Sequence, residues 1–539
     1  MKQLGFLLVL CSMTLTMWAM PARRGGVVKA QPDGTNVIVF QQGDEYFHWM
    51  VNEKGEWIER GDDGYYRVTE ALTTEVIAAR RMARVAPRED AASTLNIAPR
   101  GLVILVNFQD CAFRTPKAEM DSMLMAENYT RDYTYIKRND EGETEVHVQA
   151  VGSARKYFLE SSVGQYNPQF DVVGPVTVSR DMEYYGKNVN NFDKAPWTMV
   201  KEACELVNDS VDFSLYDNDN DGKVDFVYII YAGYGEADGA DANTIWRHSY
   251  TLSSIGTYCK VDDKRVDLYA CGNELDLFTE HHTGIGPFCH EFSHVLVLPD
   301  FYITVTGLSH RTLDMWSIMD YGSYTNECNT PPTYSAYERF FMGWLTPKLI
   351  TEPENIQLEE LQSTNTALLI SSSDEHNLIG NDPNPTTFYM LENRQQVGWD
   401  THLPGHGLML TKIQYDSRSW SGNKVNNDPS KMGVDLIEAD GNKKNHKESR
   451  PTDLFPAGAT EYKKIEGHWI SDIVETDDII YFAYKSDNTS VGGELQMSEE
   501  ILAIYNILGQ KLATTDLQSL PSGTYVLVNS SGKNKIVRK

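Results

Sequence analysis

The pattern His-Glu-x-x-His at residues 290–294 constrains this chain more than any other feature. If these residues are helical, His290 and His294 lie one turn apart on one face, so both imidazoles can reach a single Zn²⁺. Glu291 lies beside them and can take a proton from a reacting water molecule. Three fixed residues in five also occur by chance in unrelated helices. The pattern therefore indicates a zinc hydrolase only if a third ligand and a supporting turn follow.

The residues after this pattern supply a candidate third ligand. Asp300 comes six residues after His294, and Pro299 ends the helix so that the backbone can turn back toward the metal. This is the extended pattern of the metzincins, with Asp in place of the usual third His. Val297 stands where that pattern has Gly, which permits the tight turn. We expect Val297 to keep the ligand but to displace Asp300 or weaken zinc affinity.

A second turn is expected at residues 317–322, Ser-Ile-Met-Asp-Tyr-Gly. It is typical of a Met-turn, in which Met319 lies beneath the zinc ligands and Tyr321 can reach the metal or a developing oxyanion. An alternative third ligand is Glu338, on a helix predicted to start near residue 333. If Glu338 rather than Asp300 is the third ligand, the chain belongs to the other branch of the zincins.

Residues 101–345 resemble the catalytic domain of the immune inhibitor A family of secreted bacterial metalloproteases. The resemblance rests on Val-Ile-Leu-Val-Asn-Phe-Gln-Asp, Asp-Asn-Asp-Gly, Tyr-Ala-Gly, His-Glu-Phe-Ser-His with Leu-Pro-Asp-Phe-Tyr, and Asp-Met-Trp-Ser-Ile-Met, which begin at residues 103, 219, 231, 290, 298 and 314. It implies a zinc endopeptidase that is made as a zymogen.

The overall prediction is an α+β fold. A metzincin-like zincin catalytic domain is expected at residues 101–346, after a β-rich propeptide at residues 23–100. A β-sandwich is expected at residues 347–490, and a short all-β tail at residues 491–539. The tail is similar to a type IX secretion sorting signal; a β-hairpin added to the sandwich is the alternative.

Charge and the first residues point to export. The formal net charge of −28 argues against nucleic-acid binding, because a phosphate backbone is held by clustered Lys and Arg. Residues 1–22 are typical of a signal peptide, and no later run of about 20 apolar residues could span a membrane. We expect a protein that is exported through the periplasm and is then secreted or held at the cell surface.

The first unit, residues 23–100, contains short strand-like runs between Asp, Gly and Asn turns. It ends in a basic segment, residues 78–88, that a protease could cut. We interpret it as a propeptide; a small structural domain that stays attached is the alternative. Asp44 and Glu45 are candidates to cap the zinc in the zymogen, but no pattern singles them out.

Six cysteines remain after the signal peptide, and an even number in an exported chain permits disulfides. Cys259 and Cys271 flank an Asp-Asp-Lys turn and could face each other across a hairpin. Buried free thiols are the alternative.

An acidic loop offers a second candidate cation site. Its carboxylates alternate before a Gly as in the first half of an EF-hand loop, at Asp217, Asp219, Asp221 and Asp225. Position twelve is Tyr228 rather than the bidentate Glu, so the loop is not an EF-hand. A Ca²⁺-stabilised turn and an acidic solvated turn both remain open.

These features together predict a zinc metalloendopeptidase that hydrolyses peptide bonds of extracellular proteins. His290, His294 and Asp300 would hold Zn²⁺, Glu291 would be the general base, and Tyr321 would stabilise the oxyanion. The expected partners are a protein or peptide substrate and the type IX secretion machinery, and the chain is expected to be a monomer. Two alternatives are a catalytically impaired surface adhesin and a zinc hydrolase acting on a non-peptide linkage of a glycoprotein.

Overall fold

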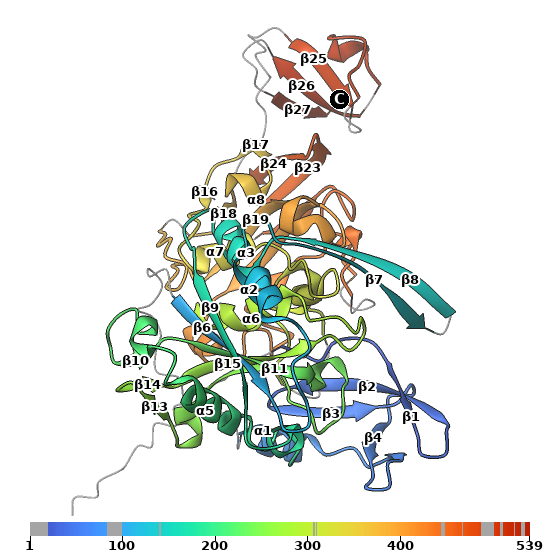
Figure 1. The fold of residues 1–539 in the computed structure, drawn as a ribbon. Helices are drawn as coiled ribbons and strands as arrows, with labels where there is room; N and C mark the ends of the chain where they lie inside the picture. The colour runs from blue at the N-terminus through green and yellow to red at the C-terminus, as the bar shows by residue number, and fades with distance from the viewer. Residues whose placement is uncertain are drawn as a thin grey trace, which may run out of the picture.

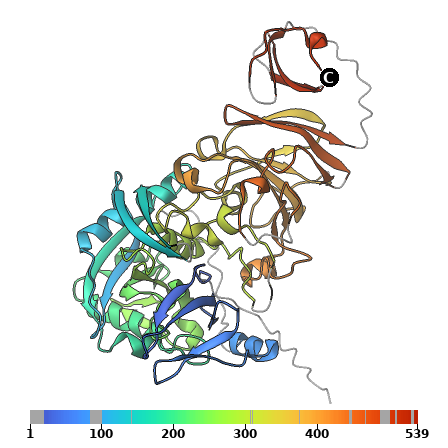
Figure 2. The ribbon, with the colours of Figure 1, turned by 90° about the vertical axis from the view of Figure 1, so that its right-hand side faces the viewer.

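The computed structural model describes residues 20–82, 100–139, 142–305, 308, 310–373, 375–442, 448–465, 467–486, 501–506, 510–521, 523–529 and 534–538. Most of the expected signal peptide, and the expected cleavage segment beyond residue 82, lie outside these residues. Figure 1 shows the chain running from an N-terminal sheet at one end to a C-terminal unit of strands at the other. The turned view in Figure 2 shows the same separation.

The N-terminal sheet is an antiparallel meander in the order β1-β2-β3-β4-β5. Its strands are β1 (Val27–Ala30), β2 (Asn36–Asp44), β3 (Phe47–Val51), β4 (Trp57–Arg60) and β5 (Tyr66–Val68), and α1 (Thr74–Met82) follows. Glu45 and Tyr46 form the tight turn between β2 and β3. Tyr46 is buried in a cluster with residues of the following domain, so the tip of this hairpin is inserted into its neighbour.

A five-stranded sheet, in the order β12-β15-β11-β6-β9, forms the centre of the next domain. Its strands are β6 (Arg100–Asn107), β9 (Gln169–Thr177), β11 (Val227–Tyr234), β12 (His248–Thr251) and β15 (Leu268–Leu275). Only the edge strand β12 pairs antiparallel. Successive β6 side chains enter two different clusters, Val103 and Leu105 on one face and Leu102 and Ile104 on the other. Burial on both faces explains the uninterrupted apolar run of β6.

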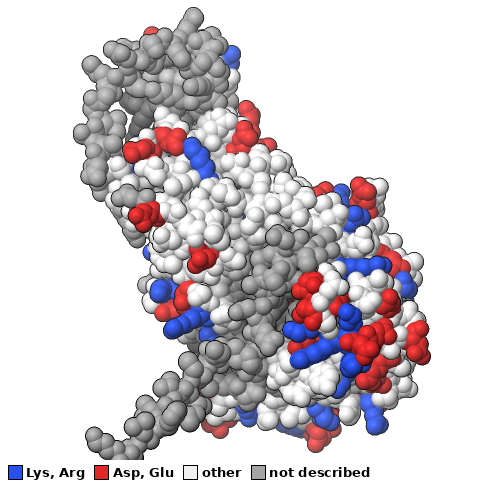
Figure 3. Space-filling model, turned by 90° about the vertical axis from the view of Figure 1, so that its left-hand side faces the viewer, with Lys and Arg blue, Asp and Glu red and all other residues white. Residues whose placement is uncertain are grey.

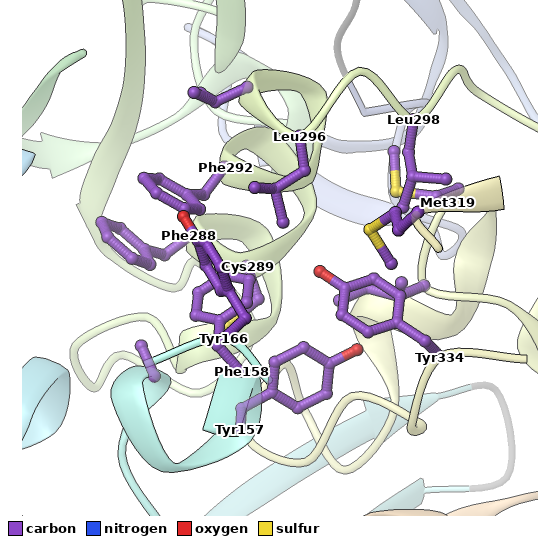
Figure 4. Packing of buried hydrophobic residues seen from close by; sticks show 14 of the residues in the cluster. Tyr157, Phe158, Tyr166, Phe288, Cys289, Phe292, Leu296, Leu298, Met319 and Tyr334 are labelled. Atoms are coloured by element: carbon purple, nitrogen blue, oxygen red, sulfur yellow. The ribbon is translucent and has the colours of Figure 1, made fainter. Parts of the chain in front are cut away.

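Helices cover both faces of this sheet. One face packs against α2 (Lys117–Met125), α3 (Ala154–Ser161) and α6 (Ile285–Val295), and the other against α4 (Met182–Gly186) and α5 (Pro196–Val207). Helix α7 (Ala336–Phe341) belongs to the same apolar cluster as α6. Figure 4 shows Phe288 and Phe292 of α6 beside Phe158 and Tyr166. The rings of Phe158 and Phe292 lie 5.1 Å apart between centroids. This aromatic packing fixes α6, and the predicted mixed α/β character is confirmed.

Two hairpins lie outside the central sheet. The long hairpin of β7 (Thr130–Asn139) and β8 (Gly142–Val151) projects from the domain and was not predicted (Figure 1). A second one joins β13 (Cys259–Val261) to β14 (Lys264–Val266), and β14 also pairs with β10 (Lys223–Val224).

The expected contact between Cys259 and Cys271 is wrong. The Asp-Asp-Lys turn closes the β13–β14 hairpin, and Cys271 lies beyond it on β15 of the central sheet. Both thiols are free and buried. The thiol of Cys204, on α5, instead lies against that of Cys259, and this contact together with burial raises the pKa of Cys204.

Two sheets follow the central domain. One has the order β16-β18-β19-β20-β21 and the other the order β17-β24-β23-β22. The bounds are β16 (Lys348–Ile350), β17 (Glu354–Leu358), α8 (Leu361–Thr364), β18 (Leu368–Ile370), β19 (Thr387–Arg394), β20 (Gly407–Gln414), α9 (Ser417–Ser421), β21 (Val434–Leu436), β22 (Tyr462–Ile465), β23 (His468–Thr476) and β24 (Ile479–Ser486). One apolar cluster contains residues of both sheets, as in a β-sandwich.

The C-terminal unit is an antiparallel sheet of β25 (Ile501–Asn506), β26 (Thr524–Asn529) and β27 (Asn534–Arg538). Among the described residues, no helix has the length and apolar character needed to cross a membrane.

Candidate metal centre and catalytic residues

Helix α6 brings the two histidines of the sequence pattern together. His290 and His294 are both fully buried, and their ring centroids lie 4.8 Å apart. The Nδ1 atom of His290 lies 2.7 Å from the carbonyl oxygen of Ile318, and that of His294 lies 2.9 Å from the carbonyl oxygen of Leu298. Each Nδ1 must therefore donate its hydrogen to a carbonyl, which leaves Nε2 with a lone pair.

Asp300 completes the cluster. Its Oδ1 atom lies 3.2 Å from Nε2 of His290 and 3.4 Å from Nε2 of His294. Oδ1 of Asp300 and Nε2 of His290 are buried and make no hydrogen bond. Lone pairs that face each other in a buried site repel unless a cation lies between them. Two imidazole nitrogens and one carboxylate oxygen are a donor set that fits Zn²⁺.

Glu338, the alternative third ligand, makes hydrogen bonds elsewhere. Its Oε1 accepts a hydrogen bond from Oγ of Ser317 at 2.6 Å, and its Oε2 accepts one from the backbone N–H of Ser335 at 2.5 Å. The second bond belongs to a capping box at the start of α7. The structure thus groups Asp300, and not Glu338, with the two histidines.

The turn between α6 and Asp300 contains Val297 in the left-handed conformation, with φ of 63°. That conformation costs an L-residue about 1–2 kcal/mol and is rare for a β-branched side chain. The chain nevertheless makes the turn that the pattern needs, because the N–H of Val297 donates to the carbonyl of His294 at 3.0 Å. Asp300 is therefore not displaced; the turn carries strain instead.

The residues of the expected Met-turn lie next to the cluster, because the carbonyl oxygen of Ile318 contacts Nδ1 of His290. Met319 is fully buried, and its carbonyl oxygen accepts a hydrogen bond from the N–H of Phe301 at 2.8 Å. Tyr321 contacts the N-terminal unit. Its ring lies 3.8 Å beneath the guanidinium of Arg24, and its described contacts do not include the cluster.

Glu291 is fully buried beside the cluster. Its Oε1 accepts a hydrogen bond from the backbone N–H of Met20 at 3.2 Å, and its Oε2 has no hydrogen-bond partner. Burial, followed by the negative charge of Asp300, raises the pKa of Glu291 well above its usual range. A carboxylate with raised basicity in a dry site is suited to accept a proton from a reacting group.

Sequence reasoning missed Asn423, which lies far along the chain after α9. Its Nδ2 donates to Oδ2 of Asp300 at 2.6 Å, and its Oδ1 accepts from the N–H of Asp300 at 2.8 Å. These two bonds hold the carboxylate so that Oδ1 points at the histidines. A ligand supported in this way keeps its orientation before the metal arrives.

We expect Asn423→Ala to lower zinc affinity about 10- to 100-fold, the range found for lost outer-shell partners of metal ligands. Competition with a chelator of known affinity measures it. The matched control is Asn427→Ala, because Asn427 accepts from the N–H of Thr304 at 2.8 Å instead. Equal zinc affinity in the two variants would contradict the supporting role of Asn423.

The N-terminal unit also contributes a carboxylate near Asp300 and Glu291. Both carboxylate oxygens of Glu45 are buried without a hydrogen-bond partner. Burial, then the charges of Asp44, Asp300 and Glu291, raises the pKa of Glu45 well above its usual range. The tip of the β2–β3 hairpin therefore presents a carboxylate close to the metal cluster.

Three of the four expected carboxylates of the acidic loop lie together. Carboxylate oxygens of Asp217, Asp219 and Asp221 lie within 4.8 Å of one another. Asp225 is not part of this group, and its Oδ2 accepts a hydrogen bond from the N–H of Asn218 at 2.8 Å. Nζ of Lys264 lies 2.5 Å from Asp217 and offsets part of the charge.

Comparison with known proteins adds an independent finding. Residues 96–345 match the model of the immune inhibitor A peptidase M6 catalytic domain. The chain is also 26% identical over 270 residues to immune inhibitor A of Bacillus thuringiensis subsp. alesti, which covers 44% of this chain and 39% of that protein. It is 26% identical over 291 residues to the pre-pro-metalloprotease PrtV of Vibrio cholerae serotype O1, covering 49% of this chain and 31% of that protein. The matched segment contains the whole histidine and aspartate cluster and is similar to the catalytic domain of these metalloproteases.

Proposed function

We propose that this protein is a secreted zinc endopeptidase that is made as a zymogen. The observation that carries the proposal is the convergence of His290, His294 and Asp300 beside the buried carboxylate of Glu291. The turn after α6 and the Met-turn beside the cluster support a metzincin-type site.

Zn²⁺ held by these three side chains would act as a Lewis acid on the scissile carbonyl. Glu291 would accept a proton from the attacking water through Oε2 and return it to the leaving amine. Met20, whose main-chain N–H bonds Oε1, belongs to the segment assigned as the signal peptide and would leave Oε1 free when that segment is removed. In the proposed active form Tyr321 stabilises the oxyanion, once Arg24 no longer covers its ring.

Latency is proposed to come from the N-terminal unit, because Glu45 presents a partnerless carboxylate at the metal cluster. A fourth ligand from the protein would occupy the position that a water molecule needs in a catalytic zinc site. This makes residues 23–100 a propeptide rather than a permanently attached domain.

We expect Glu45→Ala to raise peptide hydrolysis by the unprocessed chain at least about tenfold, which corresponds to about 1.4 kcal/mol of lost inhibition. A quenched fluorescent peptide measures the rate before any cleavage of the chain. Glu53→Ala, an exposed carboxylate in the β3–β4 turn, is the control. If both variants stay as latent as the parent, another residue holds the enzyme inactive.

Ca²⁺ is proposed as a second cation, at the loop of Asp217, Asp219 and Asp221. Because the ordered loop binds and the unfolded loop does not, calcium at 100 times its dissociation constant should add about 2.7 kcal/mol of stability. Replacing Asp219 and Asp221 together by Asn should remove the resulting rise in melting temperature, while the exposed Asp209→Asn should not. A calcium-independent melt of the parent protein would end this proposal.

Export and partners complete the proposal. Residues 1–22 are assigned as the signal peptide and residues 491–539 as a type IX sorting tail, giving a secreted or surface-held monomer. The substrate is proposed to be protein, not nucleic acid. In keeping with this, Figure 3 shows Lys and Arg scattered among Asp and Glu on one face, without a continuous basic patch among its described residues.

The experiment that tests the function is digestion of casein by the processed protein, with and without a chelator. Chelator-sensitive hydrolysis supports the proposal. Absence of hydrolysis with zinc bound favours an adhesin that keeps the fold. Release of glycan from a glycoprotein, without new peptide termini, favours a hydrolase of a non-peptide linkage.

A further inference from the structure

Residues 20–24 lie in the catalytic domain as an extended peptide. The N–H of Met20 reaches Glu291, and its carbonyl oxygen accepts from Nε1 of Trp246 at 3.2 Å. The hydroxyl of Tyr324 donates to the carbonyl of Pro21 at 2.7 Å. The N–H of Arg23 donates to the carbonyl of Ala237 at 2.8 Å. Main-chain bonds of this kind do not depend on sequence, so another peptide could make them in the same place.

The side chain of Arg23 fills a pocket whose walls belong to the catalytic domain. Its guanidinium pairs with the carboxylates of Asp276 and Glu327. It also lies 4.4 Å from the ring centroid of Phe278 and 5.8 Å from that of Tyr324. The side chain of Arg23 is only 8% exposed, so the pocket encloses it.

The two carboxylates are held in place independently of Arg23. Oδ1 of Asp276 accepts hydrogen bonds from the N–H groups of Phe278 and Thr279, both at 2.9 Å. Oε1 of Glu327 accepts one from the hydroxyl of Tyr135, on β7, at 2.5 Å. The pocket therefore keeps its shape when the N-terminal unit leaves.

Removal of Arg23 would leave an excess of negative charge. Asp238 also faces this guanidinium, and the buried Arg247 pairs with Asp238. The carboxylates of Asp276, Glu327 and Asp238 would remain, offset by Arg247 and, at Asp276, in part by Arg131. An unpaired buried carboxylate is costly, so the empty pocket would favour a cation that can enter it.

We propose that this pocket, formed by Asp276, Phe278, Tyr324 and Glu327, selects a basic side chain of the substrate, and that Arg23 of the N-terminal unit occupies it before processing. The inference rests on the proposed endopeptidase function and names its substrate class: polypeptides with Arg at one fixed position a few residues from the cleaved bond. Arg is preferred to Lys, because a planar guanidinium can bond two separate carboxylates while it stacks on an aromatic ring.

The experiment is digestion of a peptide library by the processed enzyme after removal of the released N-terminal unit. Sequencing of the products should show Arg, followed by Lys, enriched at one position. For a pair of peptides that differ only in Arg or Ala there, Asp276→Asn should lower kcat/KM for the Arg peptide about 10- to 100-fold. The value for the Ala peptide should change less than about twofold.

Two further variants make the result specific. Glu327→Gln should reproduce the loss for the Arg peptide, and Asp132→Asn, an exposed carboxylate on β7, should not. Cleavage without a basic preference, or a preference that survives both pocket variants, would overturn the pocket assignment alone. No cleavage of either peptide by the parent enzyme would instead contradict the proposed function on which it rests.

Discussion

Replacement of Glu291 by Gln is expected to lower peptide hydrolysis about 10²- to 10⁴-fold, the contribution of a positioned general acid and base. The amide cannot accept a proton, whereas His290, His294 and Asp300 are unchanged and keep the metal. Zinc analysis of the purified variant should therefore give one Zn²⁺ per chain, as in the parent. The rate is measured with a quenched peptide on the processed enzyme.

A variant of an exposed carboxylate, Glu127→Gln, controls for effects of charge alone and should keep the parent rate. Glu291→Gln with undiminished activity would exclude Glu291 as the base. Loss of zinc from this variant would mean that Glu291 is needed to hold the metal, which the arrangement of the cluster does not predict.

Replacement of Asp300 by Ala is expected to remove both zinc and activity. Asp300 supplies the only carboxylate grouped with the two histidines among the described residues, and a catalytic zinc needs three protein ligands. The purified variant should contain much less than one Zn²⁺ per chain. Glu338→Ala is the matched comparison, and it should keep its zinc.

The loss in Glu338→Ala should appear in stability. Ser317 and the N–H of Ser335 would lose their acceptor in a buried place, at a cost of about 1–3 kcal/mol each. Thermal unfolding measures this loss of stability, and metal analysis measures the zinc content of each variant. A zinc-free Glu338→Ala together with a zinc-loaded Asp300→Ala would move the third ligand to Glu338.

The parts of the site that the sequence predicts are those set by local geometry. His290 and His294 meet because they lie one helical turn apart, and Asp300 follows within a single turn of the backbone. The central strands are equally predictable, since burial on both faces demands uninterrupted apolar residues. The left-handed turn at Val297 is also set by local geometry. The pattern needs a left-handed residue at this position, and Val297 adopts that conformation with φ of 63°.

The remaining parts depend on contacts between segments that are distant in sequence. Asn423 supports Asp300 from 123 positions away, and an Asn in a loop carries no signal of that role. Glu45 resembles any polar residue in a hairpin turn until the fold brings its carboxylate into the field of Asp300 and Glu291. The expected role of Tyr321 could not include Arg24, because only the folded chain brings the two together.

The central claim is that the cluster of His290, His294 and Asp300 holds a zinc ion that is required for peptide hydrolysis. The most direct measurement is a titration of metal-free processed protein with Zn²⁺, in which the initial rate of peptide hydrolysis is followed. The rate should rise from near zero and reach its plateau at one Zn²⁺ per chain, and it should not rise at all for Asp300→Ala. Full activity in the metal-free protein, or none at any zinc concentration, would contradict the claim.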